Sequence, residues 1–317
     1  MLKVGVVGCG GISGAHIPSY LKMEDVKLVA ICDIRPEKTE RYECDKKYTD
    51  YDLMLSENEF DIIDVCLPTY LHCEFALKAL NKGINVITEK PVSLSENDVH
   101  LLYSAAEKNN VRFMVAQVLR FWNEYEVLKQ IYDTKKYGKL LSGNMWRLGG
   151  YPSGGYNNWY YDKALSGLIP FDLHIHDLDF LVYAFGEPES FTCNRKELPE
   201  QDYLSAVYQF DGFFVTAEAS WYKAKYPFYM GFRFQFEEAV VAFERDGLTV
   251  YDCNGNKIKP CDENADGENK SDFELPSSDA YFNEIRYFAD CVKNNTPVGK
   301  VTKEGLLTVL KILNKIK

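Results

Sequence analysis

The sequence lacks an excess of basic residues and long apolar runs, and each absence excludes a class of protein. Its 36 lysines and arginines are outnumbered by 47 aspartates and glutamates, which leaves a formal net charge of −11. Proteins that bind a nucleic-acid duplex or an anionic membrane surface normally carry a basic patch, so we expect neither partner. No apolar run approaches the roughly 18 residues of a spanning helix.

Paired-cysteine motifs are also missing. The nine cysteines are odd in number and show neither CxxC pairs nor the spacing of a zinc site. Cys9, Cys32 and Cys66 lie in apolar runs typical of strands, and buried free thiols suit a reducing compartment. The chain starts on a strand pattern without the basic and apolar segments of a signal peptide. We therefore expect a cytoplasmic protein.

The first third of the chain alternates short β-branched runs with amphipathic helical patterns. The expected strands are residues 3–7, 27–33, 62–66, 84–88 and 112–116. The expected helices lie near residues 14–23, 37–46, 51–56, 72–81 and 95–109, the last capped by Ser95. Strict alternation predicts right-handed βαβ units, and therefore a doubly wound parallel sheet of the Rossmann type.

The pattern changes after about residue 120. We expect helices at residues 125–134, 171–185, 280–293 and 302–315, a strand at 140–148, and antiparallel strands after Glu187. Residues 231–237 alternate with period two, and residues 260–278 form a polar, acidic surface loop. The prediction is a Rossmann domain over residues 1–120 and an α+β domain with a large open mixed or antiparallel sheet over residues 121–317. The last helices are free to pack back on the first domain.

A glycine turn follows the first expected strand. Gly8, Gly10 and Ser13 match a dinucleotide fingerprint, with Ser13 where a third small residue is usual. Gly8 permits the tight turn, and Gly10 lets the backbone approach a pyrophosphate at the helix N-terminus. The alternative is a glycine turn that binds nothing, but the surrounding strand and helix both favour the fingerprint.

Asp33 ends the second expected strand, 23 residues after Gly10, where an acid accepts hydrogen bonds from the adenosine ribose. Its alternative role is to cap the helix after Pro36. Because Asp33 would repel a 2′-phosphate, it favours NAD, whereas Arg35 could grip that phosphate. We expect NAD, with NADP tolerated.

Further motifs give the chain a resemblance to the glucose–fructose oxidoreductase, inositol dehydrogenase and MocA family. They are the glycine turn followed by His16, the segment LPTYLH at residues 67–72 after the expected strand 62–66, Glu89-Lys90-Pro91 after the expected strand 84–88, and Gly167 followed by Asp172, His176 and Asp179. His174 and Val118 depart from the family pattern. The resemblance implies cofactor contacts at Gly8, Gly10, Gly11, Ile12, Asp33, Arg35, Leu67, Pro68, His72, Glu89, Lys90 and Gln117.

By the same resemblance, Lys90, Asp172 and His176 form the catalytic set. Oxidising an alcohol transfers a hydride to the nicotinamide and a proton to a base, and an imidazole such as that of His176 titrates near neutral pH. Asp172 lies four residues earlier, on the same helical face, and Lys90 can support the alkoxide. From the residues alone, Lys90 could be a solvated surface lysine, and Asp172 and His176 a structural pair.

Several assignments remain open at this point. Asp172, His174, His176, Asp177 and Asp179 could suggest a metal, but hydride transfer needs none and we expect none. Arg120, Tyr156, Trp159 and His174 are expected substrate contacts, although the loop aromatics could equally cap a domain interface.

The expected activity is an NAD(P)-dependent oxidoreductase acting on a secondary alcohol or ketone of a sugar, sugar derivative or inositol-like polyol. The alternatives are a non-catalytic dinucleotide sensor on the same fold and a dihydrodiol-type dehydrogenase. Strands such as residues 213–221 carry apolar side chains on both faces, which marks an interface. With the resemblance, this predicts a homodimer or homotetramer formed through the C-terminal sheet.

Overall fold

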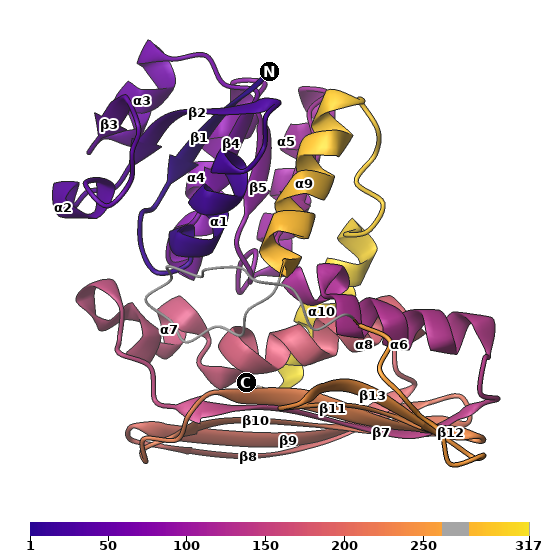
Figure 1. The fold of residues 1–317 in the computed structure, drawn as a ribbon. Helices are drawn as coiled ribbons and strands as arrows, with labels where there is room; N and C mark the ends of the chain where they lie inside the picture. Colours follow the sequence, from indigo (N-terminus) through magenta and orange to yellow (C-terminus); the bar gives the residue numbers. More distant parts are fainter. Residues whose placement is uncertain (262–278, 317) are drawn as a thin grey trace. The chain divides into compact units, whose positions relative to one another are not determined.

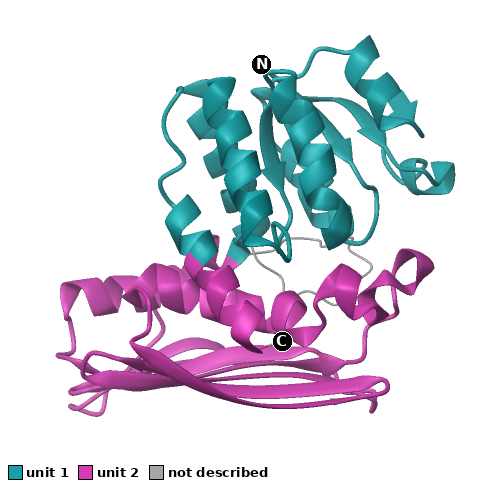
Figure 2. Ribbon diagram, turned by 180° about the vertical axis from the view of Figure 1, so that it is seen from behind, with its two compact units in different colours: residues 1–118, 266–307 teal, residues 119–265, 308–317 magenta. Residues whose placement is uncertain are grey.

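The computed structural model describes residues 1–261 and 279–316, so most of the loop predicted at 260–278 lies outside the described residues. The chain divides into two compact units (Figure 2). Unit 1 comprises residues 1–118 and 266–307, and unit 2 comprises residues 119–265 and 308–317.

Unit 1 contains a six-stranded parallel sheet in the order β3-β2-β1-β4-β5-β6. The strands are β1 (Leu2–Val7), β2 (Val26–Cys32), β3 (Lys46–Tyr48), β4 (Ile62–Val65), β5 (Asn85–Thr88) and β6 (Phe113–Val115). The helices are α1 (Ser13–Leu21), α2 (Pro36–Thr39), α3 (Tyr51–Glu57), α4 (His72–Asn81), α5 (Glu96–Lys108) and α9 (Ala280–Lys293). This strand order, which reverses direction between β1 and β4, confirms the predicted doubly wound fold.

The strands of unit 1 are apolar on both faces because helices cover both faces of a parallel sheet. All four residues of β4 are buried, as are the last four of β1. Helix α9 comes from the far end of the sequence, yet it packs beside α1, and α4 packs beside α5 (Figure 1). The carboxyl ends of the strands therefore meet at one edge of a rigid, buried sheet.

Two local predictions in unit 1 are wrong. The helix expected over residues 37–46 ends at Thr39, and β3 follows as an edge strand of only three residues. Such a short strand shows no period-two pattern, and its pairing with β2 is a tertiary contact that the local sequence does not encode. Ser95 precedes α5, but its side chain makes no capping hydrogen bond; its backbone N–H instead donates to Ser93 Oγ.

Unit 2 contains an eight-stranded mixed sheet in the order β14-β13-β12-β11-β7-β10-β9-β8. The strands are β7 (Leu140–Gly150), β8 (Ser190–Leu198), β9 (Gln201–Phe210), β10 (Phe213–Tyr222), β11 (Tyr229–Phe236), β12 (Ala239–Glu244), β13 (Gly247–Asp252) and β14 (Lys257–Ile258). All neighbouring pairs are antiparallel except β7 and β10. The predicted mixed sheet is confirmed, with β7 at its centre.

Helices α6 (Asn123–Thr134) and α8 (Ile175–Phe185) lie on one face of this sheet (Figure 1). The buried ring of Tyr125 meets Phe180 and Phe232 edge to face, at centroid distances of 4.9 and 5.0 Å. Along β11, Phe232 and Phe234 are buried and Arg233 is exposed, as the period-two pattern predicts. The helices and the inner side chains of the sheet thus share one aromatic core.

The opposite face of the large sheet carries no helix among the described residues of unit 2 (Figures 1 and 2). Phe214 on β10 is 44% exposed and Tyr203 on β9 is 39% exposed. Helix α10 (Lys303–Ile316) contributes residues to both units. Among the helices of residues 1–261 and 279–316, none has the length and apolar character needed to cross a membrane.

Candidate functional site

The glycine turn occupies the carboxyl end of β1. Gly8 has a φ of +93°, and a Cβ placed on it would lie 2.4 Å from the carbonyl oxygen of Cys66. Its own N–H donates to the carbonyl of Cys32 at 2.8 Å. The turn is thus clamped between β2 and the end of β4, and only glycine fits at this position.

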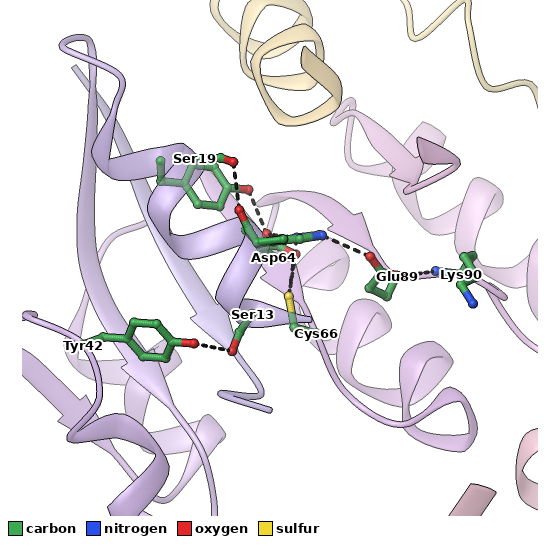
Figure 3. A network of polar contacts seen from close by, with 10 residues as sticks. Ser13, Ser19, Tyr42, Asp64, Cys66, Glu89 and Lys90 are labelled. Carbon is green, nitrogen blue, oxygen red and sulfur yellow. Dashed lines mark hydrogen bonds and ion pairs between the residues drawn. The ribbon is translucent and has the colours of Figure 1, made fainter. Parts of the chain in front are cut away.

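Gly10 is different, because no atom lies within 4 Å of a Cβ placed on it. It faces open space beside the N-terminus of α1, where the first backbone N–H groups have no partner within the helix. Ser13 donates its hydroxyl to the carbonyl of Gly10 at 2.7 Å, and its Oγ lies 3.0 Å from the hydroxyl of Tyr42 (Figure 3). Ser13 therefore braces the turn while Gly10, Gly11 and Ile12 stay available to a phosphate.

Asp33 follows β2 and is almost fully buried. Its Oδ2 accepts the N–H of Cys9 at 2.9 Å, and its Oδ1 accepts the N–H of Arg35 at 2.9 Å. The guanidinium of Arg35 also reaches this carboxylate, with Nε 3.2 Å from Oδ1. The carboxylate is therefore fixed beside the glycine turn, and the two residues that favour different cofactors form an ion pair with each other.

His72 links the segments that follow β4 and β5. Its Nε2 lies 2.7 Å from the carbonyl oxygen of Leu67, and its Nδ1 lies 2.7 Å from that of Pro91. Leu67 and Pro68 are thereby held next to the segment that carries Glu89 and Lys90. The peptide bond between Lys90 and Pro91 is cis.

Glu89 is the end of a buried chain of hydrogen bonds that reaches back to α1. Its Oε2 accepts the backbone N–H of Lys90 at 2.9 Å, and its Oε1 lies 3.0 Å from His16 Nε2. His16 Nδ1 lies 2.8 Å from Asp64 Oδ2, which also accepts the hydroxyl of Tyr20 at 3.0 Å. Figure 3 shows this chain running from Asp64 to Lys90.

His16, Asp64 and Cys66 are residue types that bind metals, and their side chains converge. His16 Nδ1 and Asp64 Oδ2 are only 2.8 Å apart, however, which is a hydrogen-bond distance. Two ligands of a tetrahedral zinc ion with bonds of about 2.0 Å lie farther apart, at about 3.3 Å. Burial, followed by the charge of Asp64, raises the pKa of the Cys66 thiol. Hydrogen bonding accounts for this cluster.

Gln117 follows β6 and is 1% exposed. Its Nε2 has no hydrogen-bond partner in the part of the chain that the structure describes. A buried amide donor without a partner calls for an explanation, and a bound ligand supplies one. Together with the open space at Gly10 and the fixed carboxylate of Asp33, this donor fits a dinucleotide at the carboxyl edge of the sheet.

In unit 2, a π-helix over Pro170–His174 leads directly into α8. It replaces the first turn of the α-helix predicted from residue 171. Asp172 and His176 are half-buried, whereas His174, which lies between them, and Asp177, which follows His176, are fully buried. π-Turns inserted at the start of a helix are frequent at functional sites, and this one leaves Asp172 and His176 as the accessible polar pair.

The buried polar residues around this helix are held by partners within unit 2. Arg120 donates to both carboxylate oxygens of Asp179, at 2.8 and 2.7 Å. His174 Nε2 lies 2.6 Å from the hydroxyl of Tyr208. Burial, followed by the charge of Arg147, lowers the pKa of His174 to about 3, so its ring is neutral at pH 7.

The aromatic loop after β7 includes a 3₁₀ segment, Tyr156–Tyr161. The rings of Trp159 and Tyr160 stack with centroids 4.1 Å apart, and those of Tyr151 and Tyr161 with centroids 4.8 Å apart. Tyr156 and Trp159 are half-buried. The loop therefore presents partly accessible aromatic faces, as stacking on a sugar or cyclitol would require.

Sequence reasoning missed the partners of His16. Asp64 lies within an otherwise apolar, fully buried strand, Ile62–Val65. An acid in such a strand must find a partner, because burying an unpaired charge is costly. An acid in an apolar strand was the signal available in the sequence, although the sequence does not indicate which residue is its partner.

The fold and turn of unit 1 define a dinucleotide-binding domain, and comparison with known families agrees. Residues 2–117 match the oxidoreductase family with an NAD-binding Rossmann fold, and residues 125–241 match the GFO/IDH/MocA C-terminal domain. The chain belongs to the GFO/IDH/MocA oxidoreductase family, as the resemblance predicted.

Several relatives act on sugar-like molecules by name. The chain is 30% identical to 2,7-anhydro-N-acetylneuraminate hydratase from Mediterraneibacter gnavus, over 62% of this chain and 53% of that protein. It is 30% identical to D-glucoside 3-dehydrogenase from Escherichia coli, over 61% of this chain and 56% of that protein. The chain thus aligns with about half the length of these curated relatives.

Solved structures share the fold along nearly the whole chain. Levoglucosan dehydrogenase in complex with NADH and levoglucosan superposes with a TM-score of 0.83 at 19% identity, covering 99% of this chain and 96% of that one. Apo scyllo-inositol dehydrogenase from Lactobacillus casei superposes with a TM-score of 0.77 at 20% identity, covering 99% and 94%. At these identities the likeness establishes the fold.

The two glycines of the turn give a matched pair of variants. Gly8→Ala forces a Cβ against the carbonyl of Cys66 at a positive φ, so it should lower the free energy of unfolding by at least about 1–3 kcal/mol. Gly10→Ala meets no atom, so stability should change by less than about 0.5 kcal/mol. Its methyl group stands where a pyrophosphate approaches, so NAD affinity should fall about tenfold or more. Denaturant unfolding measures the stability of each variant, and titration measures its affinity for NAD. Unchanged NAD affinity in Gly10→Ala would contradict the placement of the pyrophosphate at Gly10.

Proposed function

We propose that the protein transfers a hydride between NAD and a secondary alcohol or ketone of a sugar, a sugar derivative or an inositol-like polyol. The observation that carries the proposal is the placement of Lys90. It follows β5 at the carboxyl edge of the NAD-binding sheet, where doubly wound folds bind ligands, and its backbone N–H is held by Glu89. The sugar-directed names of the relatives support the substrate class.

The proposed roles follow from the chemistry of each side chain. Bound NAD would supply the hydride acceptor for oxidation of the alcohol. His176 takes the hydroxyl proton as the general base, because an imidazole titrates near neutral pH. Asp172, four residues earlier, orients that imidazole or hydrogen-bonds the substrate. Lys90 supplies a positive charge that stabilises the developing alkoxide.

Direct contact with the substrate is proposed for Tyr156 and Trp159, whose rings are partly accessible. Arg120 and His174 were predicted for the same role, but Asp179 and Tyr208 hold them inside unit 2. We therefore propose that these two residues brace the helix that carries Asp172 and His176. The nine cysteines are all free thiols, which supports the proposed cytoplasmic location.

The proposal is tested by a panel of sugars and cyclitols, monitored by NADH absorbance and by mass spectrometry of the substrate. Mass spectrometry is included because some relatives are hydratases by name, and such a reaction would consume substrate without net NADH. A dihydrodiol in the panel tests the dihydrodiol dehydrogenase alternative. If nothing turns over while NAD still binds, the non-catalytic sensor is favoured.

Lys90→Ala and His176→Ala should each lower turnover by roughly 10²–10⁴-fold, the usual range for a positioned acid or base. Lys82→Ala and His100→Ala replace exposed residues of the same types and serve as matched controls with unchanged turnover. NAD affinity should survive His176→Ala. Near wild-type turnover in both test variants, on an identified substrate, would show that the assigned site is wrong.

The protein should bind NAD more tightly than NADP, because the fixed carboxylate of Asp33 repels a 2′-phosphate. Asp33→Ser removes that charge and releases Arg35, so the preference for NAD should fall about tenfold or more, the value of a hydrogen bond to a charged group. Titration of both cofactors into the apo protein measures this. Tighter NADP binding by the unmodified protein would mean that Arg35 sets the choice.

The protein should form a homodimer or homotetramer through the uncovered face of the large sheet, where Phe214 and Tyr203 are exposed. Light scattering at micromolar concentration reports the mass. Phe214→Glu should shift the protein toward monomers, whereas Leu53→Glu, at an exposed apolar position of unit 1, should not. A monomeric unmodified protein is the outcome that rules this interface out.

A further inference from the structure

The hydrogen-bond chain that ends at Lys90 is unusually costly to build. His16 and Asp64 are completely buried, and Glu89 is 7% exposed. Two carboxylates and an imidazole leave water here, and apolar residues of similar volume are often as stable or more stable than a buried ionic cluster. Stability alone is therefore a weak reason for this arrangement, and its geometry suggests another.

The contacts define the protonation of the cluster. Each ring nitrogen of His16 lies within 3.0 Å of a carboxylate oxygen, so both nitrogens donate and the ring is an imidazolium. Burial opposes this charge, but the charge of Asp64 and its hydrogen bond to Nδ1 hold the pKa of His16 well above its usual value. Burial also disfavours the carboxylate of Glu89, yet the hydrogen bond from His16 leaves the pKa of Glu89 lowered.

The hydrogen bonds of the cluster lead from Asp64 to the backbone N–H of Lys90. Tyr20 and His16 both donate to Oδ2 of Asp64, and the thiol of Cys66 lies 3.4 Å from Oδ1, so Asp64 is anchored. His16 then fixes one oxygen of Glu89, which leaves the other aimed at the backbone N–H of Lys90. The ring of Tyr281 on α9 packs near His16, with centroids 6.1 Å apart.

We propose that Asp64, His16 and Glu89 are positioning residues that act in series to fix the backbone at Lys90, and so the placement of its ammonium group against the substrate oxygen. This rests on the proposed function, in which Lys90 supports the alkoxide. A displacement of about 1 Å at a reacting group can cost about 10²-fold in rate. None of the three needs to touch the substrate to act in this way.

The test compares kcat, KM and NAD affinity in His16→Ala and in the near-isosteric variants Asp64→Asn and Tyr20→Phe. Turnover is measured with the best substrate of the sugar and cyclitol panel. His16→Ala should lower kcat by about 10–10²-fold, with KM and NAD affinity within about threefold of the unmodified protein. Glu89→Gln keeps an oxygen for the Lys90 N–H and should retain more activity than Glu89→Ala.

Two controls separate positioning from general destabilisation. Met54→Ala removes a fully buried side chain on α3, a helix that contributes no residue to this cluster, and should lower stability without lowering kcat at a temperature where it is folded. In a double-mutant cycle, adding His16→Ala to Lys90→Ala should cause no further loss of kcat, because His16 acts only through Lys90. Independent, additive losses would overturn the proposal.

A second readout needs no substrate. The backbone N–H of Lys90 should exchange with deuterated solvent about tenfold faster or more in His16→Ala, by NMR on the NAD-loaded protein, while the N–H of Val86 in β5 stays protected. If His16→Ala does not fold, Tyr20→Phe and Asp64→Asn take its place and should show smaller shifts in the same direction. Unchanged exchange and kcat in folded variants would overturn the positioning role, whereas full activity of Lys90→Ala would overturn the proposed function itself.

Discussion

In a parallel sheet the carboxyl ends of all strands lie at the same edge, and the candidate coenzyme site depends on that constraint. The glycine turn follows β1, Asp33 follows β2, Leu67 follows β4, Lys90 follows β5 and Gln117 follows β6. These segments are far apart in sequence, yet the sheet brings them to one edge. No single motif makes this site, because each contributes one group to an edge that the buried strands hold rigid.

The buried polar residues of unit 1 hold in place the loops that form this edge. An edge site built from loops is only as precise as the contacts behind those loops. Gly8 is clamped against Cys66, Asp33 is held by two backbone N–H groups, and His72 ties the segments after β4 and β5 together. The buried chain through His16 does the same for Lys90, at the cost of burying ions. Precision at the edge explains why charge is found inside this unit.

Much of the fold could be predicted from the sequence, because hydrophobic period and turn residues are local signals. Five strands of unit 1 and helices such as α4 and α9 were predicted in this way. The failures have a common cause in tertiary contacts. Edge strand β3 exists only through its pairing with β2, and the central place of β7 depends on strands far along the chain.

In the candidate site, too, local features could be predicted from the sequence and tertiary contacts could not. Gly8 and Asp33 could be proposed because each lies at the end of a recognisable strand, whereas Lys90 was proposed from the family resemblance. The local pattern did not reveal that residues 170–174 form a π-helix, since the same residues also suit an α-helix. Nor did it reveal that Arg120 would be engaged by Asp179, 59 residues away. The type of a residue indicates the chemistry that it can perform, but tertiary packing decides which partner its side chain contacts.

The central claim is that a carbon-bound hydrogen of the substrate passes directly to the nicotinamide. The measurement that tests it most directly uses a sugar or cyclitol deuterated at its carbinol carbons, incubated with the protein and NAD. The account predicts one deuterium in the recovered NADH, detected by mass spectrometry, and a carbonyl in the product. NADH that forms without deuterium, or substrate that loses its deuterium only to water, would contradict it.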